Sequence, residues 1–416
     1  MTNPLIKSIG LLLLGVSAAF AADVPAPIAP TAPGAPTNIH WKKITLSRDF
    51  VSEGANFGDF NHDGKQDVVS GPYWYEGPDF TKRHEYMPPE PKLNPDGQYS
   101  RNFFAYTHSF KNDGWDDIII LGFPGEDTSW YENPRGKEAP DGHWTRHKVF
   151  AQTDNESPTF ADLFGNGKPV LVCMTGGRLG YAAPDYADPT KPWPFHPISP
   201  NKGFQRFTHG MGFGDVNGDG RNDLMVHDGW YEQPASLEGD PVWNFHPADF
   251  GGGGAQMFAY DVNGDGRPDV ITSLQAHGYG LCWFEQKENG SFEKHVIVGD
   301  KESDNPLGVK FSQLHAIDLI DINGDGLKDI VTGKRYFAHH SHGDVEPMAP
   351  AVLYWFELVR KDGKADFVAH RIDDDSGVGT EVIAKDIDHD KRPAIVVGNK
   401  KGTFVFLQDS AAQASK

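Results

Sequence analysis

The sequence contains little cysteine: Cys173 and Cys282 are the only two among its 416 residues. The chain can therefore form at most one internal disulfide. The repeats described below place the two residues in units that are not adjacent. We therefore expect two buried free thiols rather than a disulfide.

Basic residues are also scarce relative to acidic ones. The chain has 38 Lys and Arg against 58 Asp and Glu, which gives a formal net charge of −20 at pH 7. A protein that binds nucleic acid needs a face of clustered Lys and Arg to neutralise phosphates. The charge balance therefore disfavours nucleic acid as a partner.

Long hydrophobic runs are missing except near the N-terminus. There, "IGLLLLGVSAAF" follows Lys7 and leads into Ala19-Phe20-Ala21, a small-x-small pattern. The run is too short to span a bilayer but fits a secretory signal peptide. We expect residues 1–21 to be removed on export to the periplasm or the extracellular space. No membrane span is expected, and residues 22–38 form an Ala/Pro-rich linker.

Long stretches of helix-forming residues are few as well. Gly and Pro are abundant instead, with 47 and 31 residues, and aromatic residues make up 12% of the chain. This composition is typical of an all-β protein that is rich in turns.

A short acidic loop recurs through the chain. Four complete copies carry Asp, Asn, Asp, Gly and Asp at loop positions 1, 3, 5, 6 and 9, and three decayed copies keep part of this pattern. In chain order, the first positions are residues 59, 109, 162, 215, 261, 321 and 386, which are 46 to 65 residues apart. The sequence therefore contains seven copies of one unit.

Most copies of the loop are followed by the same kinds of segment. A β-branched run comes first, then a Trp-aromatic-Glu segment, then a strand with a His near its centre. With the aromatic-rich run before the loop, each unit has four short strands. Four strands per unit at this spacing are typical of a β-propeller.

The two ends of the repeat region complement each other. The last unit stops after "TFVFLQ", its third strand, while "HWKKITL" precedes the first unit as a strand without a unit of its own. An N-terminal strand that completes the last unit closes the ring and removes its open edges. The sequence thus predicts an all-β, seven-bladed β-propeller over residues 39–409, with a disordered tail at 410–416.

In its loops and their period, the sequence resembles the FG-GAP/VCBS repeat family, which includes the seven-bladed propeller of integrin alpha chains. The resemblance covers nearly the whole mature chain. It implies the propeller fold and calcium binding between the first and second strands of a blade. It leaves the function open, because a fold does not fix a function.

The complete loops carry the oxygen ligands that calcium prefers. In each loop we expect the side chains at positions 1, 3, 5 and 9 to bind one ion, together with the backbone carbonyl of position 7. The predicted ligands are Asp59, Asn61, Asp63 and Asp67; Asp215, Asn217, Asp219 and Asp223; Asp261, Asn263, Asp265 and Asp269; and Asp321, Asn323, Asp325 and Asp329. Up to four structural calcium ions are expected. For any single loop, the alternative is a metal-free Asx turn.

The face opposite the calcium loops can also be identified from the repeat. Loops between the second and third strands, and the crossings between units, must lie there. Of the 18 histidines, eleven occupy repeated strand or loop positions and are best explained as structural. The other seven map to this opposite face: His209, His227, His277, His315, His339, His340 and His342.

The longest insertion on this face, "GKRYFAHHSHGD", adds further polar residues, among them Asp344. A funnel of His, Arg, Lys and Tyr on an acidic protein is a candidate ligand site, although any one of these His alone is better explained as a solvated loop residue. We predict catalytic roles for His209, His277, His315, Arg335 and His339. We predict substrate binding by Arg101, Arg178, Lys334, Tyr336, His340 and His342.

Two stretches, "HGMGFGDVNGDGRNDLMVHDGWYEQP" and the segment from "VTGKRYFAHHSHGD" to "APAVLYWFEL", resemble the propeller domain of aldos-2-ulose dehydratase and its bacterial relatives. Members of that group eliminate water from keto-sugars such as 1,5-anhydrofructose. The resemblance implies a sugar lyase. The fungal enzyme also has cupin domains, which this chain lacks, so an isomerase step hosted by them is not expected.

Elimination next to a ketone needs a base for the α-proton, a stabiliser for the enolate and an acid for the departing hydroxide. Neutral His suits the base or the acid, and Arg335 or Lys334 is suited to hold the enolate oxygen. Alternatively, the clustered His bind Zn²⁺ or a similar divalent ion that polarises the carbonyl.

Two other functions remain open at this point. The first is a non-catalytic propeller that binds a glycan or a protein through the same funnel, and the second is a passive scaffold. Converging His and Arg within reach of one small ligand favour catalysis. A broad aromatic surface with scattered His favours binding, and a filled funnel favours a scaffold.

Overall fold

The computed structural model describes residues 39–409, which form 27 β-strands and two short 3₁₀ helices, η1 (Pro140–Gly142) and η2 (Glu302–Asp304). The prediction of an all-β protein is confirmed. The expected signal peptide, linker and C-terminal tail lie outside the described residues. Between residues 39 and 409, no helix is long and apolar enough to span a membrane.

The strands follow one another in antiparallel sets of four. The first set is β2 (Ala55–Gly58), β3 (Asp67–Ser70), β4 (Tyr73–Glu76) and β5 (Lys82–Glu85). The second is β6 (Phe104–His108), β7 (Asp117–Leu121), β8 (Glu126–Glu132) and the first part of β9 (Thr145–Ala161). The third is the rest of β9 with β10 (Val170–Thr175), β11 (Arg178–Ala182) and β12 (Phe195–Pro197).

The later sets repeat this order. They are β13 (Met211–Gly214), β14 (Asp223–Val226), β15 (Gly229–Glu232) and β16 (Asn244–Pro247); β17 (Gln256–Tyr260), β18 (Asp269–Ser273), β19 (Leu281–Gln286) and β20 (Phe292–Val298); and β21 (Ile317–Ile320), β22 (Asp329–Gly333), β23 (Leu353–Lys361) and β24 (Lys364–Asp373). The last set is β25 (Ile383–Lys385), β26 (Ala394–Asn399), β27 (Gly402–Gln408) and the N-terminal strand β1 (Trp41–Ser47).

Hydrogen bonds join the sets into five sheets instead of keeping every set separate. The long strand β9 belongs to two sets, and β13 pairs in parallel with β17, with Gly212 opposite Met257. A Cβ at Gly212 would lie 1.8 Å from the carbonyl oxygen of Met257. Glycine is therefore required where these two strands approach each other.

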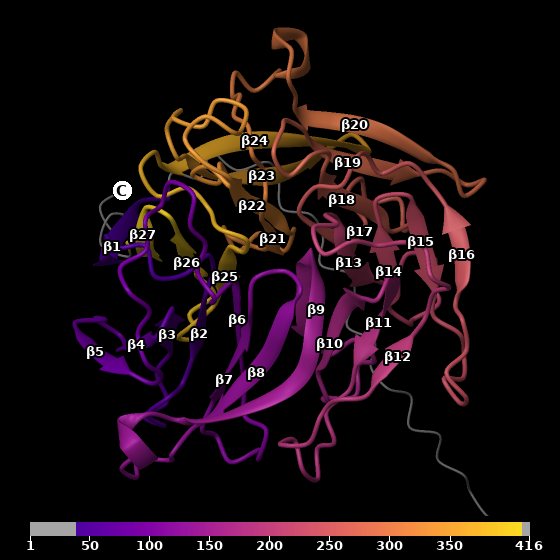
Figure 1. The fold of residues 1–416 in the computed structure, drawn as a ribbon. Coiled ribbons are helices and arrows are strands. Elements are labelled where there is room, and N and C mark those ends of the chain that lie inside the picture. The colour runs from indigo at the N-terminus through magenta and orange to yellow at the C-terminus, as the bar shows by residue number, and fades with distance from the viewer. Residues whose placement is uncertain (1–38, 410–416) are drawn as a thin grey trace, which may run out of the picture. The chain divides into compact units, whose positions relative to one another are not determined.

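The first strands of the sets lie around a common centre (Figure 1). Contacts join β2 to β6, β9 to β13, β13 to β17, β17 to β21, β21 to β25, and β25 to β2. Between β6 and β9, the hydroxyl of Tyr106 donates to the carbonyl of Pro158 at 2.8 Å. The first strands thus form a closed circuit, and their leading ends meet at one place.

The N-terminal strand completes the last set. β1 pairs antiparallel with β27, with Trp41 opposite Gln408 and Ile44 opposite Val405. The sequence predicted this pairing from the missing fourth strand. β27 is therefore covered on both sides and presents no free edge.

The hydrophobic core is divided among the interfaces between consecutive sets. In one cluster, Trp283 and Ile297 of β19 and β20 pack against Phe356 and Phe367 of β23 and β24. Burying each such side chain contributes roughly 1.5–3 kcal/mol. Because neighbouring sets bury their faces against each other, the loops at the two ends of the strands are left for ligands.

Both cysteines lie in this core. Cys173 and Cys282 are buried in different clusters and are unpaired within the described part of the chain. Burial raises the pKa of Cys282 to about 12. The prediction of two buried free thiols is confirmed.

Candidate functional site

The acidic loops link the first and second strands of their sets. In the loop that begins at Asp215, the N–H groups of Asp219 and Gly220 donate to the Asp215 carboxylate at 3.0 and 2.8 Å. Asn217 and Asp219 are exposed. The side chains at positions 1, 3 and 5 thus offer only oxygen ligands on one turn, which fits a hard cation such as calcium.

The Asp at loop position 9 lies in a different environment. Asp223 is buried, and its two carboxylate oxygens accept the N–H groups of Val216 and Gln233, each at 2.9 Å. Burial raises the pKa of Asp223 to about 6. The Asp residues at position 9 of the other complete loops bond to the backbone in the same way: Asp67, Asp269 and Asp329.

A decayed loop clarifies the role of position 9. Asp117 holds this position where Ser109 and Lys111 have replaced two ligands, and it still accepts the N–H groups of Phe110 and Asn133 at 3.3 and 2.8 Å. The position-9 carboxylate therefore fastens the loop to its strands without depending on a complete ligand set. In the decayed loop that begins at Asp386, carboxylate oxygens of residues 386, 388 and 390 lie within 4.8 Å of one another.

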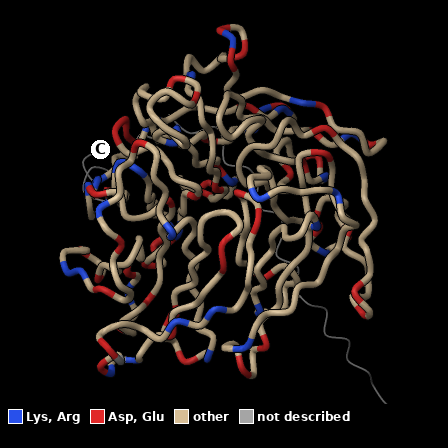
Figure 2. Tube along the Cα trace, viewed as in Figure 1, with Lys and Arg blue, Asp and Glu red and all other residues tan. Residues whose placement is uncertain are grey.

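At the other end of the strands, four ionisable residues occupy one register of the repeat. Glu53, Glu156, His209 and His315 each stand six residues before the first position of their acidic loop. That register is the leading end of each first strand. Because the first strands lie around a common centre, these side chains are directed to one region, where acidic segments are visible in Figure 2.

Glu156 is the point at which the histidines converge. Its Oε2 lies 3.1 Å from Nε2 of His315 and 3.4 Å from Nε2 of His209. His277, from the loop between β18 and β19, places its ring centroid 4.8 Å from that of His209. Each of these residues has one ligand-type atom, all within 4.8 Å of one another. We call Glu156, His209, His277 and His315 the histidine–glutamate cluster.

Three ring nitrogens of the cluster make no hydrogen bond with any described residue. They are Nε2 of His209, Nδ1 of His277 and Nδ1 of His315, all buried, and Nε2 of His209 has only the 3.4 Å approach to Oε2 of Glu156. Buried polar atoms are normally paired. Imidazole nitrogens without hydrogen bonds, gathered near one carboxylate, fit a divalent transition ion held by His and carboxylate ligands.

Burial and neighbouring charges set the protonation of the cluster. Burial, His209 and Arg335 lower the pKa of His277 to about 3. Burial and Arg335 hold the pKa of His315 well below its ordinary value. Burial alone would raise the pKa of Glu156, but His209 and His315 outweigh it and keep that pKa well below its usual range. Neutral imidazoles and an ionised carboxylate are the forms that bind metals.

Arg335 supports the cluster from the buried side. It donates from Nη2 to Oε2 of Glu53 at 2.9 Å and from Nη1 to Nε2 of His315 at 2.8 Å. The residue is only 1% exposed. It is thus placed to position Glu53 and His315 rather than to contact a ligand. Arg335 thus occupies Nε2 of His315, the nitrogen that faces Glu156, and leaves Glu156, His209 and His277 as the candidate metal ligands.

His339 stands at the open edge of the cluster. Its Nδ1 is 2.6 Å from Oδ1 of Asp344, and its ring centroid is 4.6 Å from that of His277. The side chain is 52% exposed. The hydrogen bond to Asp344 raises the pKa of His339. All five residues predicted to be catalytic are therefore brought together, four at the centre and His339 at the rim.

Two predicted substrate-binding residues are occupied by other contacts. Lys334 is buried and donates from Nζ to the hydroxyl of Ser312 at 2.9 Å. Burial lowers its pKa to about 8. Nζ of Lys401 lies over the ring of Tyr336, 4.5 Å from the ring centroid. Neither side chain is part of the histidine–glutamate cluster.

The other predicted binding residues, or their neighbours in the chain, contact residues outside the histidine–glutamate cluster. Nε of Arg101 is 3.5 Å from Glu90, and Arg178 donates to the carbonyl of Ser199 at 3.2 Å. His340 and His342 are on the insertion that carries His339, next to Ser341, which donates to Asp96 from its N–H at 2.9 Å and from its hydroxyl at 3.0 Å. The insertion is thus fastened to the crossing between β5 and β6.

Side chains fill the common centre of the first strands one or two residues after the register that holds Glu53, Glu156, His209 and His315. The amide of Gln256 donates to the carbonyl of Thr380 at 3.0 Å and accepts the N–H of Ile317 at 2.9 Å. Glu381 accepts the N–H of Ala105 at 2.9 Å. These contacts give the candidate site a closed floor. The cluster lies above the filled part, and His277 remains partly exposed.

Sequence reasoning missed Glu53, Glu156 and Lys400. Glu53 and Glu156 were missed because they differ in residue type from the histidines, and because Glu156 precedes a decayed loop. When the units are aligned on loop position 1, both glutamates fall in the register of His209 and His315. Lys400 donates to the carbonyl of Ala338 at 3.1 Å and so holds the insertion that carries His339. No comparable sequence signal marks Lys400.

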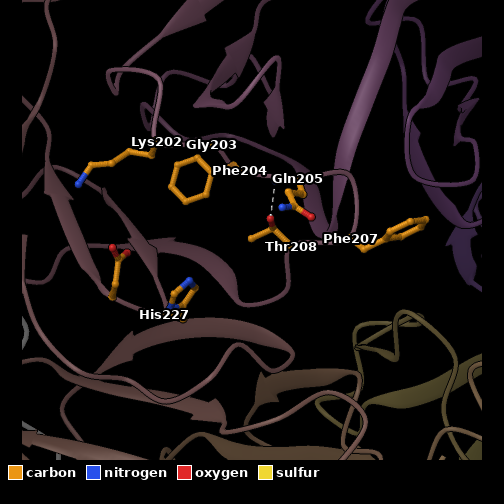
Figure 3. A pocket seen from close by; sticks show the side chains of 8 residues that line it. Lys202, Gly203, Phe204, Gln205, Phe207, Thr208 and His227 are labelled. Carbon is orange, nitrogen blue, oxygen red and sulfur yellow. Dashed lines mark hydrogen bonds between the residues drawn. The ribbon is translucent and has the colours of Figure 1, made fainter.

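A cavity of about 360 Å³ is lined by residues that include Lys202, Phe204, Gln205, Thr208 and His227. Figure 3 shows the Phe204 ring, His227 and the Gln205–Thr208 turn around it. The N–H of Gln205 donates to the hydroxyl of Thr208 at 2.8 Å. Thr208 directly precedes His209, so the cavity and the cluster share a segment of chain.

Comparison with known proteins supports the repeat in one region. Residues 261–332 match the model of an FG-GAP-like repeat. The matched segment runs from the first Asp of one complete loop through the next complete loop. No curated protein matches the sequence.

Several solved structures are similar to this chain. One is an Agrocybe aegerita lectin, described as recognising non-reducing terminal N-acetylglucosamine: TM-score 0.48, 18% identity, 79% of this chain and 81% of that chain. Another is virginiamycin B lyase from Staphylococcus aureus, with a TM-score of 0.48 and 9% sequence identity. The match covers 89% of this chain and 99% of that one. A Lactobacillus plantarum protein has a TM-score of 0.44 and 8% identity, over 80% and 86% of the two chains. At these scores no ligand or activity is transferred to this chain.

Proposed function

We propose that this protein is an exported, seven-bladed β-propeller that acts as a lyase on a keto-sugar, by elimination next to the carbonyl. The observation that carries the proposal is the convergence of the histidine–glutamate cluster, drawn from four repeats, beside the His339–Asp344 pair. Export is supported by the N-terminal segment alone.

The propeller interpretation is supported by the topology. Seven sets of four strands, the closed circuit of first strands and the pairing of β1 with β27 are the features expected of a closed propeller. Calcium at up to four acidic loops is proposed to have a structural role. The side chains at positions 1, 3, 5 and 9 of these loops are the proposed ligands, and position 9 also holds the loop to the backbone.

Glu156, His209 and His277 are proposed to hold a divalent transition ion such as Zn²⁺. When bound, such an ion supplies a Lewis acid for the ketone oxygen. Arg335 and Glu53 keep His315 and Glu156 in place. The floor below the cluster limits substrate to the open face.

The His339–Asp344 pair is proposed to move the proton. Asp344 accepts the hydrogen bond from Nδ1 of His339, which leaves Nε2 as the basic nitrogen. Nε2 takes the proton from the carbon next to the ketone, the electrons of that C–H bond form the new double bond, and the C–O bond at the next carbon breaks. His339 then returns the proton to the leaving hydroxide, so that an enone and water form with no net proton uptake.

NMR of the mature protein, loaded with zinc and calcium, tests this proposal. Incubated with 1,5-anhydrofructose and a panel of 3-keto-glycosides, the wild type is expected to produce enone signals. His339→Ala is expected to lower the rate by about 10²- to 10⁴-fold, and His277→Ala to abolish it. His143→Ala, at a histidine that precedes β9 and pairs with Glu85 of β5, is the matched control and retains the rate.

The alternative function is a non-catalytic propeller that binds a glycan or a protein. Partly exposed aromatic rings on the same face, those of Tyr99, Phe123 and Phe207, favour it. Absence of turnover on every substrate, with the wild type folded and its metal bound, would exclude the lyase for this panel and leave binding as the function.

A further inference from the structure

Three aromatic side chains form a row beside the candidate site. The ring centroid of Phe123 lies 4.9 Å from that of Tyr99 and 5.7 Å from that of Phe207. Phe207 is 47% exposed, which is unusual for so large an apolar side chain. Tyr99 and Phe123 are partly exposed. We call these three residues the aromatic ledge.

The ledge is continuous with the site. The Phe123 ring packs on Phe103, with 5.4 Å between centroids, and the guanidinium carbon of Arg335 lies 5.5 Å from the Phe103 centroid. On the other side of the ledge, Thr208 directly follows Phe207 in the chain. The N–H of Glu156 donates to the carbonyl of Thr208 at 2.8 Å. The ledge and the metal-ligand candidates are therefore fixed relative to each other.

Contacts of the neighbouring residue Arg206 keep Phe207 at the ledge. Arg206 donates from Nε to the carbonyl of Pro124 at 2.8 Å, and the N–H of Asn155 donates to the carbonyl of Arg206 at 3.0 Å. Gly125 has φ of +90°, and a Cβ there would lie 2.1 Å from Nη2 of Arg206. Glycine at 125 is needed both for this backbone conformation and for the close approach of Arg206.

We infer that the ledge binds a ring of the substrate that does not react. This inference rests on the lyase function proposed above. Aromatic side chains stack on flat apolar faces, and ligand sites combine such faces with a few polar groups. A row of three rings matches one sugar ring or one aromatic aglycone and is far smaller than a stable protein interface.

The position of the ledge defines the class of substrate. Because the aromatic ledge adjoins the histidine–glutamate cluster, a ring stacked on the ledge belongs to the same molecule as the keto-sugar held at the cluster. The substrate is then a keto-glycoside with a second ring, and a single-ring keto-sugar uses only part of the site.

Kinetics with two substrates test the inference. Phe207→Ala removes an exposed ring, so the variant is expected to fold, and its KM for a 3-keto-glycoside with a phenyl aglycone should rise roughly three- to tenfold with little change in kcat. Its KM for 1,5-anhydrofructose should not change. Val368→Ala, an exposed apolar residue on the outer strand β24, is the matched control. An equal change in KM for both substrates, or none for either, overturns the inference.

A binding measurement separates this inference from the proposed reaction. Phenyl β-glucoside has no ketone and cannot eliminate water, so saturation-transfer NMR reports binding alone. Transfer to the phenyl protons is expected with the wild type and Val368→Ala, and is lost with Phe207→Ala. If the wild type shows this binding but turns over no keto-sugar, the lyase is excluded and the ledge stands as a glycoside site. Turnover without Phe207-dependent binding excludes the ledge alone.

Discussion

The protonation of a few buried side chains affects both the candidate site and the stability of the fold around it. Glu381 is the clearest case outside the cluster, because it lies in the floor between β25, β2 and β6. Its Oε1 accepts the N–H of Ala105, and its Oε2 has no partner among residues 39–409. Burial holds the pKa of Glu381 well above its ordinary value of 4.5.

This burial makes stability depend on pH. A carboxyl group whose pKa is higher in the folded protein than in the unfolded chain costs stability as pH rises above the unfolded value, because folding then requires uptake of a proton. We therefore expect Glu381→Gln to raise Tm at about pH 8, with a gain that shrinks as pH falls toward 4.5. Calorimetry across this range, with the exposed Glu238→Gln as control, checks it. A gain that does not vary with pH contradicts the assignment.

Glycine residues, as well as the hydrophobic core, determine how closely strands of this protein approach each other. The parallel pairing of β13 with β17 exists because Gly212 leaves room for the carbonyl of Met257. A different device recurs between the third and fourth strands, where the His246 ring stacks on Trp230 at 4.1 Å and its Nε2 lies 2.8 Å from Glu232. This stacking agrees with the structural role that the sequence predicts for the repeated histidines.

A methyl group at position 212 should force β13 and β17 apart. Gly212→Ala is expected to destabilise the protein by at least about 2 kcal/mol, since the added Cβ overlaps backbone that has no room to move. Gly252→Ala is the control, because the nearest atom to a Cβ there is 3.6 Å away. Urea unfolding followed by tryptophan fluorescence measures both, and similar midpoints for the two variants would disprove the packing argument.

The acidic loops connect local chemistry to the stability of the whole protein. Without an ion, the carboxylates at positions 1 and 5 repel each other, whereas the position-9 carboxylate is held by backbone N–H groups in either state. Calcium is therefore predicted to stabilise the fold mainly by relieving the repulsion between the carboxylates at positions 1 and 5.

Removal of calcium should lower Tm, and calcium but not magnesium should restore it. At a calcium concentration of one hundred times Kd, each site contributes about 2.7 kcal/mol. Asp219→Ala should lower stability only when calcium is present, while Asp117→Ala, in a loop without a complete ligand set, should cost about 1–3 kcal/mol in either condition. A Tm that does not respond to EGTA would argue against calcium in these loops.

Much of this architecture is visible in the sequence, because a repeated loop of fixed spacing specifies where strands begin. The acidic loops indicated the four-stranded units, and the unmatched strand at residues 41–47 indicated its pairing with β27. The fusion of sets through β9 and β13 was not predictable, since it depends on how closely backbones approach.

The site was predictable to a similar degree. Topology placed His209, His277, His315 and His339 on one face, and their convergence followed from the common centre of the strands. The burial of Arg335 could not be read from an insertion that is otherwise polar, and its contacts lead us to propose that it positions Glu53 and His315. Glu156 carried a signal only in the register of the repeat.

The central claim is that Glu156, His209 and His277 form one metal centre separate from the acidic loops. Metal analysis of the mature protein after exposure to zinc and calcium and removal of free ions tests it most directly. The wild type should retain about one zinc per chain with a tetrahedral site, and His209→Ala and Glu156→Gln should lose the zinc while keeping their calcium. Zinc retained by both folded variants, or no zinc bound by the wild type, would contradict the account.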